Sequence, residues 1–250
     1  MREILYGRNA VYEALRAGRR RCETVLIAKG VRESGSAARI LELANERSIP
    51  IRQVERSQLD QMGEVNHQGV AAQVTPYPYA EWDAVLAQPK QRNEPAFVLL
   101  LDCLQDPQNL GTLLRTAEAV GIHGVVIPRH RAAHVTPAVS NASSGAVEHL
   151  LVAEVVNLVR AMEELKERGL WLAGLEQAPG AQDYRQADLN MALGLVVGSE
   201  GQGLGRLVRE HCDLLIQLPM RGQINSLNAS VAGSIALYEA WQQRKAAESQ

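Results

Sequence analysis

The chain has few cysteines, and they form no recognisable pattern. Cys22, Cys103 and Cys212 are the only three among 250 residues. They are far apart, include no C-x-x-C pair and are accompanied by no histidine pair at ligand spacing. A disulfide framework and a zinc site both depend on such spacing. We therefore expect reduced thiols in ordinary surroundings and no bound metal.

Long apolar runs are also missing. No stretch approaches the roughly 18 apolar residues of a membrane span. The first residues, MREILYGRNA, lack the basic-then-apolar order of a secretory signal. The chain is nevertheless 46% apolar, enough for the core of one large domain or two modest ones. These features predict a soluble, cytoplasmic, globular protein.

The chain as a whole has no basic excess, since its net charge is -2. The charge is unevenly distributed, because residues 1–60 hold 12 Lys and Arg against 8 Asp and Glu. The basic residues are densest in RAGRRR, Arg16 to Arg21. Such a cluster can contact nucleic-acid phosphates. It can equally be a solvated helix end, where arginines favour the helix dipole.

The first part of the chain alternates between helix and strand patterns. An amphipathic helix that ends at Gly18 is predicted by GRNAVYEALRAG, and a second helix by ESGSAARILELANERSI. Strands are predicted by TVLIAKG, IRQV and GVAAQV. Residues 1–75 therefore read as a small α/β domain. Residues 76–95 are rich in proline and are predicted to be a linker to a second domain at residues 96–250.

The second domain follows a clearer α/β alternation. Continuous apolar runs at 97–101 and 124–128 are typical of buried parallel strands. Between them, NLGTLLRTAEAVG predicts a helix with Asn109 as N-cap and Gly121 as C-cap. Its apolar stripe consists of Leu110, Leu113, Leu114, Ala117 and Val120. Similar alternation up to a final helix predicts a mostly parallel sheet with flanking helices.

Three loops follow predicted strands of this sheet, and ligands of such sheets bind at the carboxyl ends of strands. The loops are DCLQDPQNLG, GSEGQGLGR and LPMRGQINSLNAS. The second is rich in glycine but matches neither the dinucleotide fingerprint nor a phosphate-binding P-loop. It contains one acid, Glu200. The loop is either a tight surface turn or a backbone that lies against a flat ligand.

The start of the last helix is unexpectedly polar. Asn225, Ser226, Asn228 and Ser230 lie among apolar residues at helical spacing. Asn225 or Ser226 can cap the helix, which leaves Asn228 and Ser230 unexplained. A stripe of Ala and Gly farther along permits close packing against another backbone. We interpret the helix start as the wall of a ligand pocket or a subunit interface.

The stretches NLGTLLRTAEAVG, LVVGSEGQGL and LPMRGQINSLNASVAGSIALYEA, in this order, resemble the three signature motifs of SpoU/TrmH-type RNA 2′-O-ribose methyltransferases of the SPOUT superfamily. The similarity covers about residues 96–245. The segments GRNAVYEAL and NHQGVAAQV look like the substrate-binding domain of the branch that methylates large-subunit ribosomal RNA. The nearest likeness is to enzymes that modify a guanosine in the peptidyl-transferase loop of 23S rRNA.

This resemblance implies a fold, a cofactor and an assembly. We expect a knotted SPOUT domain with a deep trefoil knot, preceded by a small α/β RNA-binding domain. The cofactor is expected to be S-adenosylmethionine, bound by Gly198, Leu218 and Leu227. We expect a homodimer that acts on 23S rRNA or a large-subunit precursor, with no DNA or membrane partner.

The resemblance also assigns catalytic residues. Arg115 matches a family arginine that has been proposed as general base. A guanidinium, with a pKa above about 12, stays protonated, so an electrostatic role is preferred. The remaining catalytic residues implied are Asn109, Glu200, Ser226 and Asn228. Relatives often have lysine at Asn141, so a phosphate contact is either missing or supplied by Arg129, His130 or Arg131.

Two alternatives remain at this point. One keeps the enzyme but changes its substrate to transfer RNA or to an adenosine of ribosomal RNA, since the catalytic motifs do not specify a nucleotide. The other is a non-catalytic RNA-binding or ribosome assembly factor. The presence of all five catalytic residues argues against the second alternative.

Overall fold

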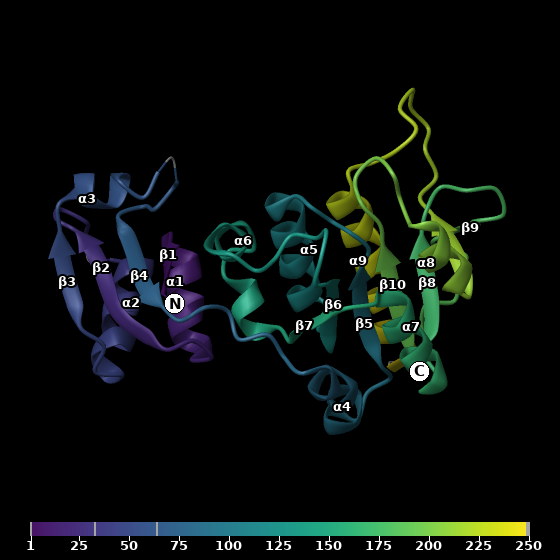
Figure 1. The fold of residues 1–250 in the computed structure, drawn as a ribbon, viewed down its shortest axis with the longest axis horizontal. Coiled ribbons are helices and arrows are strands. Elements are labelled where there is room, and N and C mark those ends of the chain that lie inside the picture. The colour runs from purple at the N-terminus through teal and green to yellow at the C-terminus, as the bar shows by residue number, and fades with distance from the viewer. Residues whose placement is uncertain (1, 33, 64, 249–250) are drawn as a thin grey trace. The chain divides into compact units, whose positions relative to one another are not determined.

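A computed structural model describes residues 2–32, 34–63 and 65–248. The chain divides into two compact units (Figure 1). The first combines Met1–Pro78 with Val135–His149, and the second combines Tyr79–His134 with Leu150–Gln250. Two features differ from the expected division. The segment 135–149 groups with the N-terminal unit, and the expected linker contains a helix, α4 (Trp82–Arg92).

The first unit contains a four-stranded sheet in the order β1-β4-β2-β3. β1 and β2 both pair with β4 in antiparallel fashion, and β2 pairs with β3 in parallel. The strands are β1 (Glu3–Tyr6), β2 (Cys22–Ala28), β3 (Ile51–Val54) and β4 (Val70–Val74). The helices are α1 (Arg8–Ala17), α2 (Ser36–Glu46), α3 (Arg56–Asp60), α6 (Pro137–Ala142) and the 3-10 helix η1 (Ala146–His149).

Both predicted helices and all three predicted strands of this unit are present. Helix α1 ends at Gly18, whose φ of 66° is the left-handed conformation that glycine adopts without strain. Leu5, Val11, Val25 and Ile40 are fully buried in the core between the helices and the sheet. Strand β1, of four residues, and helix α3, of five, were not predicted.

The second unit contains a seven-stranded sheet in the order β7-β6-β5-β10-β8-β11-β9, and its strand pairs are parallel, as predicted. The strands are β5 (Phe97–Leu101), β6 (Gly124–Pro128), β7 (Val152–Val155), β8 (Trp171–Leu175), β9 (Gln182–Asp183), β10 (Leu193–Val197) and β11 (Leu214–Gln217). Besides α4, the helices are α5 (Pro107–Ala119), α7 (Leu158–Glu167), α8 (Arg206–His211) and α9 (Ala229–Glu248).

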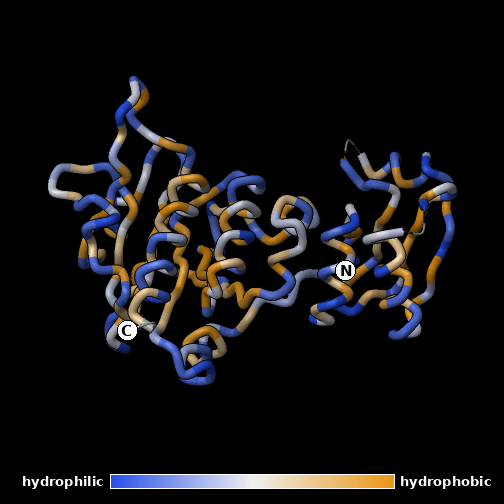
Figure 2. The backbone as a smooth tube through the Cα atoms, turned by 180° about the vertical axis from the view of Figure 1, so that it is seen from behind, coloured by the Kyte–Doolittle hydropathy of each residue, from blue (hydrophilic) through white to orange (hydrophobic). Residues whose placement is uncertain are grey.

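Helices cover this sheet, and the strands at its centre are buried along their whole length. Every residue of β5, β6 and β10 is buried, which explains their continuous apolar sequences. Leu100 and Val196 pack with Met162 of α7 and Val208 of α8. Val197, the next residue of β10, faces α9 near Gly233. Hydrophobic segments gather inside each unit, as the orange tube of Figure 2 shows.

Helices α5 and α9 pack closely, as the small-residue stripe predicted. A Cβ atom at Gly233 would come within 2.6 Å of Cδ2 of Leu113, so α9 approaches α5 where glycine leaves room. The hydroxyls of Thr116 and Ser234 lie 2.8 Å apart across the same contact. The predicted apolar stripe of α5 is buried in full.

The helix starts differ from the prediction. Helix α5 begins at Pro107, and its N-cap is Asp106, whose carboxylate accepts from the backbone N–H of Gln108. Asn109 therefore lies inside the helix. Helix α9 begins at Ala229, and Oδ1 of Asn228 accepts from the N–H groups of Ser230 and Val231. Asn228 is thus the cap in place of Asn225 or Ser226, and it satisfies the exposed helix donors.

Across the described part of the chain, every helix is too short or too polar to serve as a membrane span.

Candidate active site

A cavity of about 430 Å³ lies at the carboxyl ends of β8, β10 and β11. The last residues of these strands, Leu175, Val197 and Gln217, all line it. Because the strands are parallel, their carboxyl ends meet at one edge of the sheet, where ligands of such folds bind. The cavity falls within the size range of small-molecule sites, which is roughly 300–1,000 Å³.

The glycine-rich loop after β10 forms one wall of the cavity. Ser199 and Gly203 exchange two backbone hydrogen bonds of 3.1 Å, which close the loop into a tight turn. A Cβ atom at Gly198 would lie 2.3 Å from the carbonyl carbon of Gly203. No other residue fits at Gly198 unless the loop opens. The loop is therefore both a tight turn and a bare backbone surface that faces the cavity.

A polar network joins all three loops that follow the strands. Asn109 of α5 donates from Nδ2 to Oε1 of Glu200 at 2.6 Å. Its Oδ1 accepts from Nδ2 of Asn228 at 3.0 Å and from the hydroxyl of Ser230 at 3.1 Å. Asn109 is 9% exposed and Ser230 is 3% exposed, so this amide is a largely buried junction. Glu200 also lines the cavity and so connects the network to it.

The structure brings together most of the residues singled out from the sequence. Gly198, Leu218 and Leu227 all line the cavity, as does Ser226. Arg115 is exposed on α5, as its position off the apolar stripe predicted, and it is not among the residues that line the cavity. Its assigned role therefore depends on more than this cavity.

Sequence reasoning left two features of this site unassigned. Ser230 was noticed as an unexplained hydroxyl in an apolar helix, and its contact with Asn109 now explains it. Glu176 and Gln177, just beyond β8, also line the cavity. Their only signal in the sequence was that they follow a predicted strand. That signal is too general to select them.

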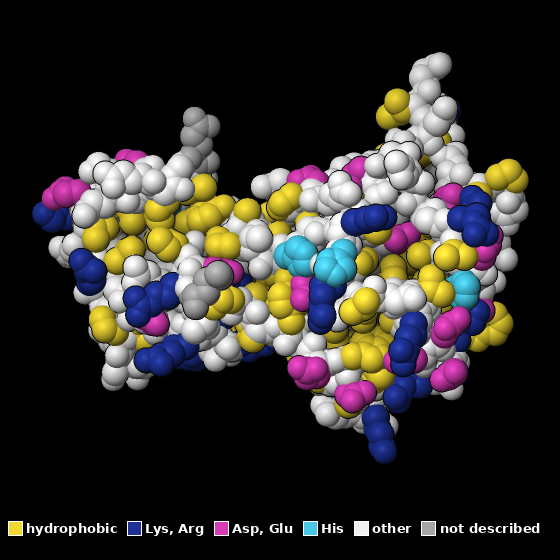
Figure 3. All heavy atoms as spheres, viewed as in Figure 1, with side chains coloured by type: hydrophobic (Ala, Val, Ile, Leu, Met, Phe, Trp, Pro, Cys, Tyr) yellow, Lys and Arg dark blue, Asp and Glu magenta, His cyan; other side chains and the backbone are white. Residues whose placement is uncertain are grey.

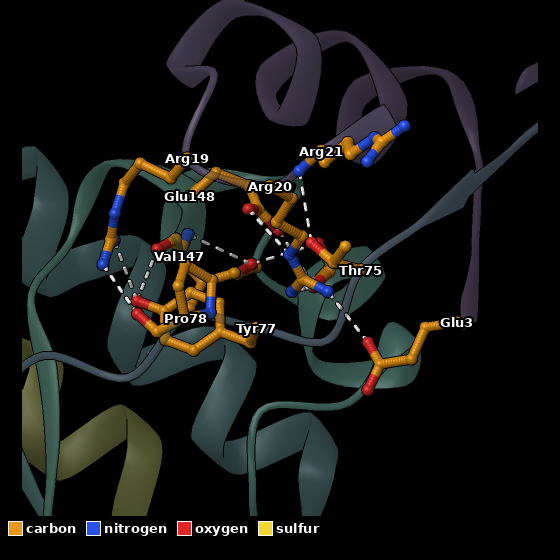
Figure 4. Close-up of polar contacts among 11 residues, drawn as sticks. Glu3, Arg19, Arg20, Arg21, Thr75, Tyr77, Pro78, Val147 and Glu148 are labelled. Atoms are coloured by element: carbon orange, nitrogen blue, oxygen red, sulfur yellow. Dashed lines mark hydrogen bonds and ion pairs between the residues drawn. The ribbon is translucent and has the colours of Figure 1, made fainter. Parts of the chain in front are cut away.

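The cluster Arg16 to Arg21 is not a uniform surface patch. In the first unit, Arg20 is 4% exposed and contacts Glu148 at 3.0 Å and Glu3 at 2.8 Å (Figure 4). Arg19 donates to the hydroxyl of Tyr77 at 3.1 Å. Arg20 is therefore a structural residue, and neither of the two interpretations of the cluster, phosphate contact or solvated helix end, applies to it. Arg16 and Arg21 stay exposed.

Asn141, the departure from the family pattern, has a structural contact. Its Nδ2 donates to the backbone carbonyl of Tyr6 at 3.1 Å, within the first unit. Arg129, His130 and Arg131, in the second unit, are exposed. On the face drawn in Figure 3, Lys and Arg side chains are interspersed with Asp and Glu.

The three cysteines are free thiols, as predicted. Desolvation by burial raises the pKa of all three, and it raises the pKa of Cys212 to about 12. A thiol with a raised pKa stays protonated near neutral pH and is a poor nucleophile. Catalysis by a cysteine is therefore not supported.

Comparisons with known proteins agree on one family. Residues 96–238 match the profile described as the SpoU rRNA Methylase family, and residues 4–80 match the profile described as RNA 2′-O ribose methyltransferase substrate binding. The chain is 48% identical over 242 residues to YacO of Bacillus subtilis, whose name places it in the TrmH family of tRNA/rRNA methyltransferases. That alignment covers 97% of this chain and 96% of YacO.

Solved structures show the same similarity. The SpoU methyltransferase AviRb from Streptomyces viridochromogenes, solved in complex with the cofactor AdoMet, matches with a TM-score of 0.81 at 25% identity. The match covers 98% of this chain and 91% of AviRb. A TrmH/SpoU tRNA modifying enzyme of A. aeolicus matches with a TM-score of 0.56 at 28% identity, and covers 62% of this chain and 77% of its own.

Proposed function

The chain belongs to the SpoU/TrmH family of RNA methyltransferases, and from this premise we propose that it methylates the ribose 2′-hydroxyl of one guanosine in the peptidyl-transferase loop of 23S rRNA. S-adenosylmethionine is the methyl donor. The sequence motifs resemble those of RlmB, which modifies a guanosine of this loop. The family further implies a homodimer and a trefoil knot, and both stay predictions.

The observation that supports this proposal best is the cavity at the strand ends. Its lining includes Gly198, Leu218 and Leu227, the three residues assigned to the cofactor. The closed glycine turn presents bare backbone at Gly198, where a Cβ atom has no room. Apolar side chains and backbone groups together suit a ligand with a flat aromatic ring and a polar tail. The residues present therefore fit S-adenosylmethionine.

Bound S-adenosylmethionine supplies a methyl group on a sulfonium, which is already a good leaving group. The protein must therefore hold the ribose hydroxyl in place and stabilise negative charge on its oxygen. Through Nδ2 and Oδ1 of its amide, Asn109 fixes Glu200 of the glycine loop and Asn228, the cap of α9. This network sets the position of the cavity wall at which Ser226 also lies.

Arg115 is proposed to act as a permanent positive charge. It gathers the phosphate next to the target ribose and stabilises the negative charge that develops on the oxygen as the hydroxyl proton passes to solvent. Because Arg115 is exposed and does not line the cavity, we propose that the active site is completed when two chains form the homodimer. Arg115→Lys is expected to lose most single-turnover methylation, since lysine lacks the planar fork of a guanidinium. Near-normal methylation by Arg115→Lys would contradict this role.

The part of the chain that each similarity covers supports ribosomal RNA over transfer RNA as the substrate. The similarity to the tRNA modifying enzyme of A. aeolicus covers 62% of this chain, whereas residues 4–80 match a substrate-binding profile. Since YacO is named for both tRNA and rRNA, transfer RNA is the second candidate. An adenosine of ribosomal RNA and a non-catalytic assembly role are the others.

The proposal is tested by mapping ribose methylation in cells that lack this protein. Large-subunit rRNA is compared with that from cells that express the wild type or the Arg115→Ala variant. We expect loss of one 2′-O-methylguanosine in the peptidyl-transferase loop, restored by the wild type alone. An unchanged rRNA map would overturn the proposed substrate and direct the same mapping to transfer RNA. If transfer RNA is unchanged too, the non-catalytic role is left.

A further inference from the structure

Glu176 is a carboxylate in the wall of the cofactor cavity to which no role has been assigned. It follows the last residue of β8 and lines the cavity together with Gly203 and Gln217. Its backbone N–H donates to the carbonyl of Ile216 at 3.0 Å, which fixes the main chain at this point. Its side chain is 17% exposed. An acid in this position is costly unless both carboxylate oxygens find donors.

Only one of the two carboxylate oxygens has a donor. Oε1 accepts from Nη1 of Arg209 on α8 at 3.3 Å. Oε2 is buried and has no hydrogen-bond partner among the described residues. The carboxyl group also lies beside the glycine turn, since a Cβ atom at Gly203 would be 3.7 Å from its Cδ. Unsatisfied buried acceptors are rare in folded proteins and need an explanation.

We propose that Oε2 of Glu176 accepts a hydrogen bond from a ribose hydroxyl of S-adenosylmethionine. This inference rests on the proposed function. Oε2 is buried in the structure, and the terminal torsion of a glutamate is soft. Because Glu176 lines the cavity, a rotation about this torsion can bring Oε2 within reach of a ligand there. The cofactor then supplies the donor that the protein lacks.

The surroundings of Glu176 select the ribose among the donors of the cofactor. The cofactor carries an α-ammonium group, two ribose hydroxyls and an adenine amino group. The guanidinium of Arg209, 3.3 Å from the same carboxylate, disfavours a second cation such as the ammonium. Neighbouring Leu175, Val197 and Leu218 suit the adenosine half of the molecule. The adenosine half carries two kinds of donor, the ribose hydroxyls and the adenine amino group. Of these we choose the ribose hydroxyl, because dinucleotide-binding folds also use a carboxylate that accepts from a ribose hydroxyl.

The inference is tested by calorimetric binding of S-adenosylhomocysteine and three analogues to the full-length protein. The analogues lack the ribose 2′-hydroxyl, the ribose 3′-hydroxyl or the adenine amino group. For the wild type, loss of one hydroxyl is expected to raise Kd by about 10- to 100-fold, as for a hydrogen bond to a charged group. Glu176→Ala should bind S-adenosylhomocysteine more weakly than the wild type does, by the same factor. The deoxy analogue that the wild type binds weakly should bind to Glu176→Ala as tightly as S-adenosylhomocysteine does.

A matched control is Glu210→Ala, because Glu210 is an exposed glutamate of α8 that pairs with Arg206 and does not line the cavity. Its Kd values should equal those of the wild type. The inference is overturned if both deoxy analogues bind the wild type as tightly as S-adenosylhomocysteine does. This outcome requires only the wild-type protein, so it can be observed even if Glu176→Ala does not fold. The inference is overturned equally if removal of the adenine amino group is the only change that raises Kd for the wild type, and if this rise is absent in Glu176→Ala. Wild-type protein that binds none of the four compounds would instead contradict the proposed function itself, and the inference with it.

Discussion

Asn109 is the side chain at which the polar network of the second unit converges. Its amide is complementary to both neighbours, since Nδ2 donates to Glu200 and Oδ1 accepts from Asn228 and Ser230. No other side chain of similar size offers a donor and an acceptor in this arrangement. The hydroxyl of Ser230 also lies 2.6 Å from Oδ1 of Asn228, so its single proton is shared between two amide oxygens. Removal of one member therefore disturbs several contacts.

Asn109→Ala is expected to lower kcat/KM for RNA methylation by about 10- to 100-fold, because small displacements of positioning groups have effects of this size. It should also lower the free energy of unfolding by about 1–3 kcal/mol, because buried Ser230 loses a partner. Single-turnover kinetics and urea denaturation measure the two effects. The control is Gln108→Ala, an exposed neighbour on α5. Equal rates for the two variants would contradict the role of the network.

His123 is a second residue whose chemistry is set by burial. Its ring is 1% exposed, and Nδ1 accepts from the backbone N–H of Phe97 at 3.1 Å. Desolvation, reinforced by the charge of Arg92, lowers the pKa of His123 from its ordinary value. The folded protein therefore holds this ring neutral at a pH where the unfolded chain binds a proton.

Because the folded pKa of His123 is lowered, the unfolded state binds more protons below about pH 6.5. The stability due to the neutral ring is present above that pH and is lost as the pH falls through the window down to the folded pKa. The free energy of unfolding should decline between pH 7.5 and pH 5, by at most about 1.4 kcal/mol per pH unit from this one group. His123→Asn should show a smaller decline in urea titrations. Parallel curves for the two proteins would refute this.

At the scale of elements, the glycine turn after β10 is held at several points. Asn109 holds Glu200 within the turn, and Oδ2 of Asp102 at the end of β5 accepts from the N–H of Gly205 at 2.7 Å. The turn itself is closed by the Ser199–Gly203 pair. These contacts fix a backbone surface in advance of binding, which reduces the entropy lost when a ligand binds.

Gly198→Ala is expected to raise Kd for S-adenosylhomocysteine more than about 10-fold, because the added Cβ forces the turn open and removes the backbone surface. Calorimetry measures the change. Gly222→Ala is the matched control, since Gly222 lies in another loop and a Cβ atom there has nothing within 4 Å. If Gly198→Ala binds as the wild type does, the turn is not part of the cofactor site.

At the scale of the whole molecule, the chain builds its first unit from two separate segments. Val135–His149 interrupts the sequence of the second unit and packs with Met1–Pro78. Arg20 connects the two segments, because it contacts Glu3 in one and both Glu148 and Ser140 in the other. Tyr77 adds a hydrogen bond of 3.2 Å to the carbonyl of Val147 (Figure 4). Burial raises the pKa of Glu148, so its charge depends on Arg20.

Arg20→Ala is expected to lower the free energy of unfolding by about 3–5 kcal/mol, because removal of one partner leaves a buried carboxylate without its counter-charge. Arg21→Ala should change it by less than about 0.5 kcal/mol, since that side chain is exposed. Urea denaturation of both variants makes the comparison. Similar losses for the two would mean that the cluster acts through its total charge.

The sequence by itself determined the fold class, the parallel sheet and most helices and strands. Apolar runs such as 97–101 and helical stripes such as that of α5 are local patterns, and local patterns are visible along the chain. Helix starts were less reliable. Asn109 and Ser226 can both cap a helix, but the N-cap of α5 is Asp106 and the N-cap of α9 is Asn228. Several adjacent polar residues can each cap a helix, and packing decides among them.

The motifs predicted a set of candidate site residues, while only the tertiary structure decided what each one contacts. The junction at Asn109 joins residues 91, 119 and 121 positions away in the sequence, and no periodicity records such distances. Likewise, Arg20 looked like its neighbours Arg19 and Arg21 until the fold buried it against Glu148. Burial and pairing arise when distant segments meet, so they are properties of the folded chain and not of any stretch of its sequence.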